Sequence, residues 1–294
     1  MALTEVLQTV VTAFMEGVTA PSEAWRQGFD VMTDDVAIKK LASFSGIGAI
    51  TVWDGVNDLD VADVNDRLNQ TLTYTEYGLQ LRIPKRKAKD VPGLLEGGVR
   101  KLGVAVANTY GSIGASRMAD IFASTTSAGD GVALISNSHT MASGALRDNL
   151  LGSNFDRSAF FGAINLAMLW PSYHGQEDAF HEDPMVFYGS PQASTLLETV
   201  GEVFTSAVSS DQMQTNMARG YNVTPVIWPK LTVSTRAALV STLRKPLVYW
   251  IRDDAEQGLA FNDEDNLNIK VNVDFAIATG CKPDPAGIIG FYTA

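Results

Sequence analysis

Side chains that could bind a metal ion gather in one short stretch of the sequence, between Pro171 and Pro184. They are His174, Glu177, Asp178, His181, Glu182 and Asp183. On a helix, His174, Glu177 and His181 would lie on one face and could ligate the metal of a hydrolase. The flanking prolines instead favour a polar loop, and two histidines alone make an incomplete catalytic metal site. We therefore expect no metal and no cofactor, and keep a metal-dependent hydrolase as an alternative.

His139 is the other residue with catalytic potential, because Ser136 and Ser138 stand close to it in the sequence. A histidine can act as the general base that activates a serine nucleophile. Adjacent residues on a strand point to opposite faces, however, and the sequence places no acidic partner for the histidine. We therefore predict a hydrogen-bonded turn histidine and no catalytic residue. Cys281 has no activating neighbour except Lys282, which predicts a quiet, semi-buried thiol.

Composition excludes several classes of protein. The chain has 294 residues, 46% of them hydrophobic, and a formal net charge of −11, which argues against a broad basic face for nucleic acid. The sequence contains no P-loop and no dinucleotide-binding glycine motif. Its single cysteine excludes a disulfide framework within one chain. No apolar run approaches the roughly 20 residues of a membrane span. The N-terminus lacks a signal-peptide pattern, so we expect a soluble protein made in a cytoplasm.

The clearest secondary structure is predicted between Tyr74 and Phe122. Leu79, Leu81 and Ile83 alternate with polar residues, as in a half-buried strand. A long helix is predicted over about 94–122. Its apolar stripe recurs every three or four residues and comprises Leu95, Val99, Leu102, Val106, Tyr110 and Ile113. Each glycine in this helix costs roughly 1 kcal/mol relative to alanine, so another element must pack along much of its length.

The rest of the chain has an α+β pattern without a regular βαβ rhythm. A helix predicted over 3–18 packs either on its own domain or, as an arm, on a neighbouring subunit. Further helices are predicted at 158–170, 192–206 and 236–243. Strands are predicted at 132–135, 185–188, 222–229, 247–252, 267–273, 275–278 and 288–292. A long hairpin is expected within 61–92, with its strands joined either around 76–78 or at the basic residues after Pro84.

Two charged segments stand out in the sequence. The basic run comprises Lys85, Arg86, Lys87 and Lys89, and the acidic stretch begins with Asp253, Asp254 and Glu256. Either one alone is typical of a solvated surface. Together they suggest complementary docking between copies of the chain. Each exposed pair would contribute roughly 0–1 kcal/mol, but a symmetric assembly would repeat it many times.

Several segments, in this order, resemble one protein family. The segment from Asp130 to His139 (DGVALISNSH) is similar to the Y-D-G-x-x-L-F-S-x-S-H-P segment of the Mu-like major head subunit family. A glycine precedes Asp130, Thr140 replaces the usual proline, and Asn149 resembles the asparagine that follows. The segments 185–191, 226–231, 245–252 and 284–287 resemble later parts of the same family. The similarity covers about 71–294 and identifies the chain as resembling major capsid proteins of tailed bacteriophages, which have the Hong Kong 97 fold.

This resemblance implies a shell-forming protein and not an enzyme. The implied parts are an N-terminal arm (1–60), an extended β-hairpin loop (61–92), a peripheral domain with a spine helix (93–127), an axial domain (128–240), peripheral return strands (241–275) and axial closing strands (276–294). Copies would form pentamers and hexamers of an icosahedral capsid, assembled in the host bacterial cytoplasm around weakly contacted double-stranded DNA. Portal, scaffold and decoration or cement proteins are the other implied partners, and no membrane is. An encapsulin-like shell protein of the same fold is the alternative.

Overall fold

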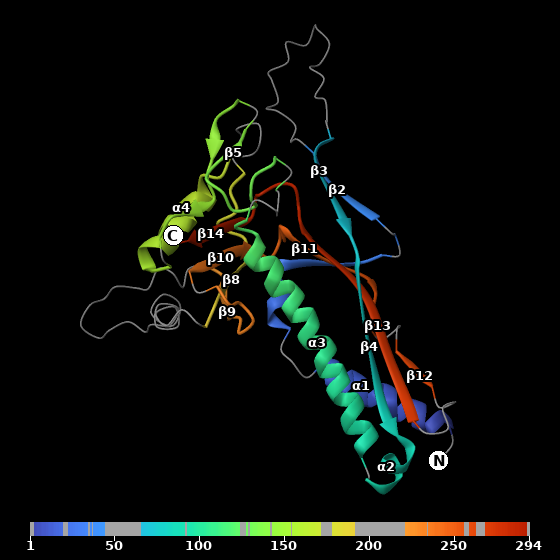
Figure 1. The fold of residues 1–294 in the computed structure, drawn as a ribbon. Coiled ribbons are helices and arrows are strands. Elements are labelled where there is room, and N and C mark those ends of the chain that lie inside the picture. The colour runs from blue at the N-terminus through green and yellow to red at the C-terminus, as the bar shows by residue number, and fades with distance from the viewer. Residues whose placement is uncertain are drawn as a thin grey trace, which may run out of the picture.

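The protein has an elongated part and a compact part (Figure 1). Helix α3 (Leu94–Asp120) and the strands beside it form the elongated part, and a five-stranded sheet with helix α4 (Arg157–Met168) forms the compact part. The computed structural model describes residues 3–19, 23–34, 36, 38–44, 66–91, 93–123, 128, 130–141, 143–153, 155–171, 178–191, 221–233, 235–255, 259–262 and 268–292.

Helices α1 (Leu3–Thr19) and α3 confirm the two helices predicted near these positions. They pack against each other within the chain, which favours the own-domain alternative for the N-terminal helix. Gly17 and Gly103 lie where the helices cross, and a Cβ on Gly103 would stand 2.9 Å from the amide nitrogen of Val18. Phe14 is fully buried beside this crossing. The glycines of α3 thus let a second backbone approach, which side chains would prevent.

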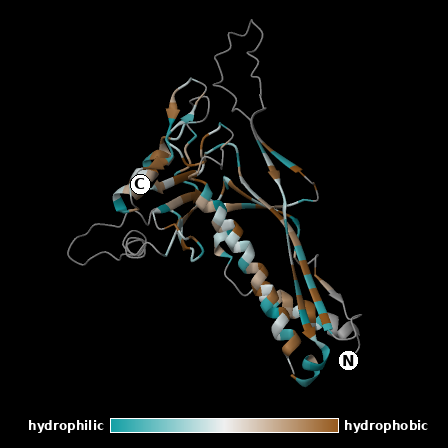
Figure 2. Cartoon of the chain, viewed as in Figure 1, coloured by the Kyte–Doolittle hydropathy of each residue, from teal (hydrophilic) through white to brown (hydrophobic). Residues whose placement is uncertain are grey.

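The sheet of the elongated part is built on one long strand, β13 (Asn268–Cys281). This strand merges the separately predicted strands 267–273 and 275–278. Its neighbours are β11 (Leu247–Asp253), the short β12 (Ala260–Asn262) and β4 (Thr75–Pro84), all antiparallel to it. Strand β1 (Phe29–Thr33) extends the sheet in parallel with β11. Figure 2 shows the alternating hydropathy along β13, whose residues Val271, Val273 and Phe275 are buried.

The β-hairpin of the elongated part differs from the one expected within 61–92. Strand β3 (Asp66–Thr73) pairs with β2 (Ile38–Phe44), whereas β4 pairs with β13. Only Tyr74 separates β3 from β4, so the two strands follow one another along the chain (Figure 1). Leu72 and Tyr74 pack against Trp250 at the base of the hairpin, and the ring centroids of Tyr74 and Trp250 lie 4.5 Å apart. The hairpin therefore begins earlier in the chain than the sequence indicated.

The compact part contains a sheet with the strand order β7-β14-β10-β8-β9. The strands are β7 (Leu150–Leu151), β14 (Ile288–Tyr292), β10 (Arg236–Ser241), β8 (Met185–Gly189) and β9 (Val223–Ile227). Helix α4 packs on one face of it, and the Asp156 carboxylate caps this helix by accepting from the backbone N–H of Ala159 at 2.7 Å. A two-residue pair, β5 (His139–Thr140) with β6 (Leu146–Arg147), lies beside the sheet.

Two of the predicted elements are wrong. The sequence predicts a helix over 236–243, but 236–241 form the central strand β10, which is buried on both faces and so shows no alternation. It predicts a strand over 132–135, but these residues form a turn-rich segment held by side-chain hydrogen bonds. The predicted helix 192–206 lies outside the described residues.

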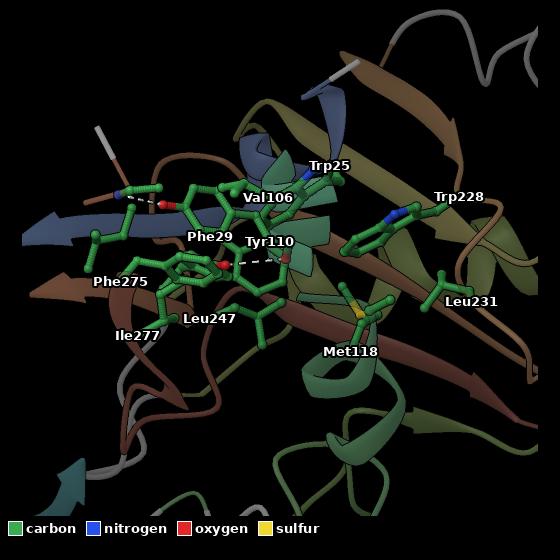
Figure 3. Close-up of a cluster of buried hydrophobic side chains, with 14 of the residues drawn as sticks. Trp25, Phe29, Val106, Tyr110, Met118, Trp228, Leu231, Leu247, Phe275 and Ile277 are labelled. Atoms are coloured by element: carbon green, nitrogen blue, oxygen red, sulfur yellow. Dashed lines mark hydrogen bonds between the residues drawn. The ribbon is translucent and has the colours of Figure 1, made fainter. Parts of the chain in front are cut away.

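Aromatic side chains join the elongated part to the compact part (Figure 3). The rings of Trp25 and Trp228 stack with centroids 5.2 Å apart, and Phe29 meets both edge-on. Trp25 belongs to η1 (Ala24–Gly28), a short 3-10 helix before β1. The hydroxyl of Tyr188 donates to the carbonyl of Trp25 at 2.6 Å and accepts from the N–H of Gly28 at 2.8 Å. One continuous core therefore runs through both parts of the molecule.

Candidate functional site

The basic run lies at the far tip of the elongated part. It forms the short helix α2 (Lys85–Asp90), which connects β4 to α3 (Figure 1). Arg86, Lys87 and Lys89 are exposed, and no ion pair joins them to the residues that the structure describes. The sequence predicted a cluster of charge here but not the helix. The tip presents concentrated positive charge on a chain whose net charge is negative.

The acidic stretch follows β11 and is partly engaged within the subunit. Asp254 accepts a hydrogen bond from the hydroxyl of Tyr110 at 2.9 Å, and this hydroxyl accepts from the N–H of Ala255. Burial raises the pKa of Tyr110 well above its usual range, which keeps the phenol protonated as a donor. Asp253 is exposed and lies 3.7 Å from Arg252. Of the predicted docking residues, Glu256 lies outside the described part of the chain.

The basic run and Asp253, where the acidic stretch begins, lie far apart along the sheet of one chain. On β13, Asn268 is opposite Pro84, which precedes the basic run, whereas Ala276 is opposite Asp253. Eight residues of strand separate these two positions, which corresponds to about 26 Å at 3.3 Å per residue. A contact between Asp253 and the basic run would therefore require two copies of the chain.

His139 is a buried structural residue. It is fully buried, and its Nδ1 lies 2.7 Å from a carboxylate oxygen of Asp130 while its Nε2 lies 3.1 Å from the carbonyl oxygen of Leu134. Burial raises the pKa of Asp130, but the hydrogen bond and charge of His139 outweigh burial and hold this pKa below its usual value. Both ring nitrogens are therefore occupied, and neither serves Ser136 or Ser138. The predicted hydrogen-bonded histidine is confirmed, with an acidic partner that the sequence did not reveal.

Asn149 holds the same segment from the other side. Its side-chain nitrogen donates to the carbonyls of Leu134 and Ile288, and its side-chain oxygen accepts from the N–H of Ser136 at 2.8 Å. The segment that carries the sequence resemblance, 130–149, is thus a hydrogen-bonded loop against β14. His139 and Asn149 thus stabilise the fold of this segment through their hydrogen bonds.

The proposed metal ligands do not come together in the described part of the chain. Asp178 and Asp183 both bind the guanidinium of Arg244, at 2.8 and 3.3 Å. His181 lies 3.8 Å from Glu182. Within the described ranges no group of three or more potential ligands could hold a metal ion, and His174 and Glu177 lie outside those ranges.

Arg244 and Arg147 are organising residues that the sequence did not single out. Arg244 lies over the ring of Phe180 and donates to Asp178 and Asp183, which fixes the loop before β8. Arg147 is almost completely buried over the ring of Trp170 and donates to the carbonyl of Pro171 at 3.1 Å. Their partners are distant in the sequence, so residue type alone gave no signal.

Cys281 is completely buried, more so than the predicted semi-buried thiol. Burial raises the pKa of Cys281 to about 12, so the thiol stays protonated and unreactive. Separately, none of the helices among the described residues combines the length and hydrophobicity that a membrane span needs.

Comparisons with known proteins identify the fold. No protein-family model matches the chain, and no curated protein matches it in sequence. Among solved structures, the capsid of cyanophage P-SCSP1u matches with a TM-score of 0.63 and 11% identity over 93% of this chain and 88% of that one. The mature capsid of bacteriophage PhiM1 matches with a TM-score of 0.59 and 12% identity over 93% and 88% of the two chains.

A third solved structure matches nearly end to end. The virus-like particle from Pyrococcus furiosus matches with a TM-score of 0.52 and 12% identity over 97% of this chain and 98% of that one. The chain therefore has the α+β capsid fold of the Hong Kong 97 type that the sequence resemblance predicted.

Proposed function

We propose that this chain is the major capsid protein of a tailed bacteriophage and assembles into the icosahedral shell around a double-stranded DNA genome. The observation that carries the proposal is the capsid fold, which the cyanophage capsid shares over 93% of this chain and the virus-like particle over 97%. The geometry of the described residues adds support, because the elongated part and its hairpin extend away from the compact part (Figure 1). Strand β4 of this part is mostly exposed in the single subunit, which suits contacts with other copies.

Within this proposal, the parts of the chain take the roles expected of the fold. The compact part acts as the axial domain, and α3 with β4 and β13 forms the peripheral domain. The β2–β3 hairpin takes the role of the extended loop, earlier in the chain than 61–92. Copies form pentamers and hexamers, a portal and a scaffold protein assist assembly, and a decoration or cement protein is a further partner. The shell assembles in the host cytoplasm and contacts its DNA weakly, because its net charge is −11.

The basic run docks on an acidic surface of a neighbouring copy, for which Asp253, Asp254 and Glu256 are the candidates. Reversing the charges of Lys85, Arg86, Lys87 and Lys89 should reduce particle yield, because attraction at every copy of the contact becomes repulsion. Circular dichroism of the unassembled subunit should stay unchanged, since these side chains lie at the surface of the tip. Normal yield from this variant would dismiss the docking role.

Negative-stain electron microscopy of the full-length expressed protein tests the function directly. Closed shells of uniform size are expected, and a protein that stays monomeric at every concentration would overturn the proposal. Nucleic acid inside particles made during infection separates a phage capsid from an encapsulin-like shell, which would hold a protein cargo. Metal analysis of the purified chain tests the hydrolase alternative, for which a stoichiometric metal bound through His174, Glu177 and His181 is the required result.

A further inference from the structure

Strand β4 has one edge that no described strand occupies. Its other edge pairs with β13 at every position from Thr75 opposite Ile277 to Pro84 opposite Asn268, without a register shift. Within the described residues, β13 is the only strand paired with β4, and most of β4 is exposed. A long, regular edge presents a row of backbone N–H and C=O groups and is a template for another strand.

Leu79 marks the centre of this edge. It is opposite Val273, on the face of the sheet where Tyr77 and Leu81 pack against the core. Val273 is 2% exposed, whereas Leu79 is 56% exposed. The core therefore covers the inner strand and leaves the apolar side chain of the edge strand in solvent. A strand added beside β4 would cover Leu79.

The sequence of β4 is complementary to itself. Its only charged residues, Glu76 and Arg82, each lie three positions from Leu79. If two copies of β4 pair antiparallel with Leu79 opposite the partner's Leu79, each Glu76 is opposite the partner's Arg82. Tyr77 is then opposite the partner's Leu81, so Tyr77, Leu79 and Leu81 of both copies share one face, and the charged residues share the other.

We propose that the free edge of β4 binds the same edge of a second copy, in the antiparallel register centred on Leu79. The contact joins the two sheets into one continuous sheet across a two-fold axis. This proposal rests on the proposed shell function and specifies one contact between neighbouring subunits.

Other pairings of this edge are less favourable. A parallel pairing in register would place like charges opposite each other, which is destabilising. Moving the centre of the antiparallel pairing to Gly78 or Gln80 leaves Glu76 opposite Gln80 or Pro84, without its charge partner. The β2–β3 hairpin of the same chain cannot fill the edge, because β3 leads directly into β4 through Tyr74.

Disulfide trapping of full-length particles tests the proposal. In the Leu79→Cys variant, the paired Cβ atoms would lie about 4.5–5.5 Å apart, close enough for a disulfide after small adjustments. Most subunits should then run as dimers in non-reducing electrophoresis and return to monomers with dithiothreitol. The native Cys281 is fully buried and should form no disulfide in this experiment. Thr75→Cys is the matched control, exposed on the same strand, because its two copies would lie about 26 Å apart.

Charge exchange gives a second, independent readout. Glu76→Arg or Arg82→Glu alone should reduce particle yield about tenfold, because two cross-strand pairs change from attraction to repulsion. The double variant carrying both changes should recover the yield, which a merely local role of either residue would not produce. If the Leu79→Cys variant forms normal particles without disulfide-linked dimers, or the double charge variant is no better than the single ones, the strand pairing is overturned and the shell function stays intact.

A failure of the shell function can be distinguished from a failure of the strand pairing. If the unaltered chain forms no particles, cross-linking of the Leu79→Cys variant is scored on the subunit at high concentration. Disulfide-linked dimers of this variant would then support the strand pairing without a shell, and monomers would reject both.

Discussion

The two sheets of this protein differ in how much of their surface the subunit itself covers. In the compact part, β8 and β10 are buried almost throughout, with α4 on one face and the aromatic core around Trp25 on the other. In the elongated part, β4 is mostly exposed, and the outer face of β13 carries Lys270, Asn272 and Asp274. The elongated part therefore leaves a face and an edge of its sheet uncovered.

The elongated part and the compact part are each stabilised by a different kind of interaction. Close backbone contact at glycine joins α1 to α3 in the elongated part, whereas side-chain hydrogen bonds of His139, Asn149 and Arg244 organise the compact part. Backbone contact depends on shape, since any added atom must displace a helix. Hydrogen-bonded side chains depend on charge and protonation. Substitutions can therefore separate the two modes of stabilisation.

The largest effect is expected at the crossing of α1 and α3. In Gly103→Ala, the new Cβ would overlap the carbonyl oxygen of Phe14 and stand 2.9 Å from the amide nitrogen of Val18. Backbone atoms cannot rotate away, so the helices must separate, which should cost about 3 kcal/mol of unfolding free energy. Urea unfolding of the unassembled subunit, followed by circular dichroism, measures this loss.

Gly97→Ala is the matched control on the same helix. Nothing lies within 4 Å of the position of its Cβ. Alanine favours a helix over glycine by about 1 kcal/mol, so this variant should be slightly more stable than the original chain. If both variants lost the same stability, the loss would not come from the backbone contact at Gly103, because Gly97 makes no such contact.

A smaller loss, about 2 kcal/mol, is expected for His139→Gln, because the carboxylate of Asp130 loses its strongest partner in a largely buried site. The pKa of Asp130 lies below its ordinary value of 3.8 in the folded chain. The stabilisation is therefore complete above pH 3.8 and is lost as pH falls through the lowered folded-state pKa. The difference in unfolding free energy between the two chains should shrink in that acidic range.

His181→Gln supplies the comparison for this variant. His181 lies at 3.8 Å from an exposed Glu182, so its replacement should change stability by less than about 0.5 kcal/mol. Equal losses for the two histidine variants, or a His139→Gln difference that is independent of acidification, would contradict the role given to the Asp130 pair.

Sequence patterns predicted β4 and β13 more clearly than β10, for a physical reason. In a strand with one solvent-exposed face, apolar and polar side chains must alternate. Strands β4 and β13 show this alternation clearly enough to be predicted from the residues alone. Strand β10 is buried on both faces, so its continuous apolar run Ala-Ala-Leu-Val resembled a short helix. The capsid fold itself was predicted from the order of several motifs along the chain, because no single motif is specific.

Contacts between distant segments were beyond the sequence patterns. The pairing of β3 with β2, and of β4 with β13, depends on tertiary packing, and hairpin length gave no guide to it. Arg244 binds Asp178 across an interval of 66 residues, which no local pattern reveals. The self-complementary arrangement of Glu76, Leu79 and Arg82 was visible in the sequence, but it acquires meaning only once β4 is known to be an edge strand.

The smallest effect is expected for Glu16→Gln, which tests whether charge contributes to the contact of α1 with α3. Glu16 forms an ion pair with Arg100, but the two side chains are 52% and 53% exposed, so water screens their attraction. The variant should lose less than about 0.5 kcal/mol in the same urea experiment, and added salt should leave the original chain unaffected. A loss as large as that of Gly103→Ala would mean that charge holds α1 in place. The distinction between a shape-dependent elongated part and a charge-dependent compact part would then be untenable.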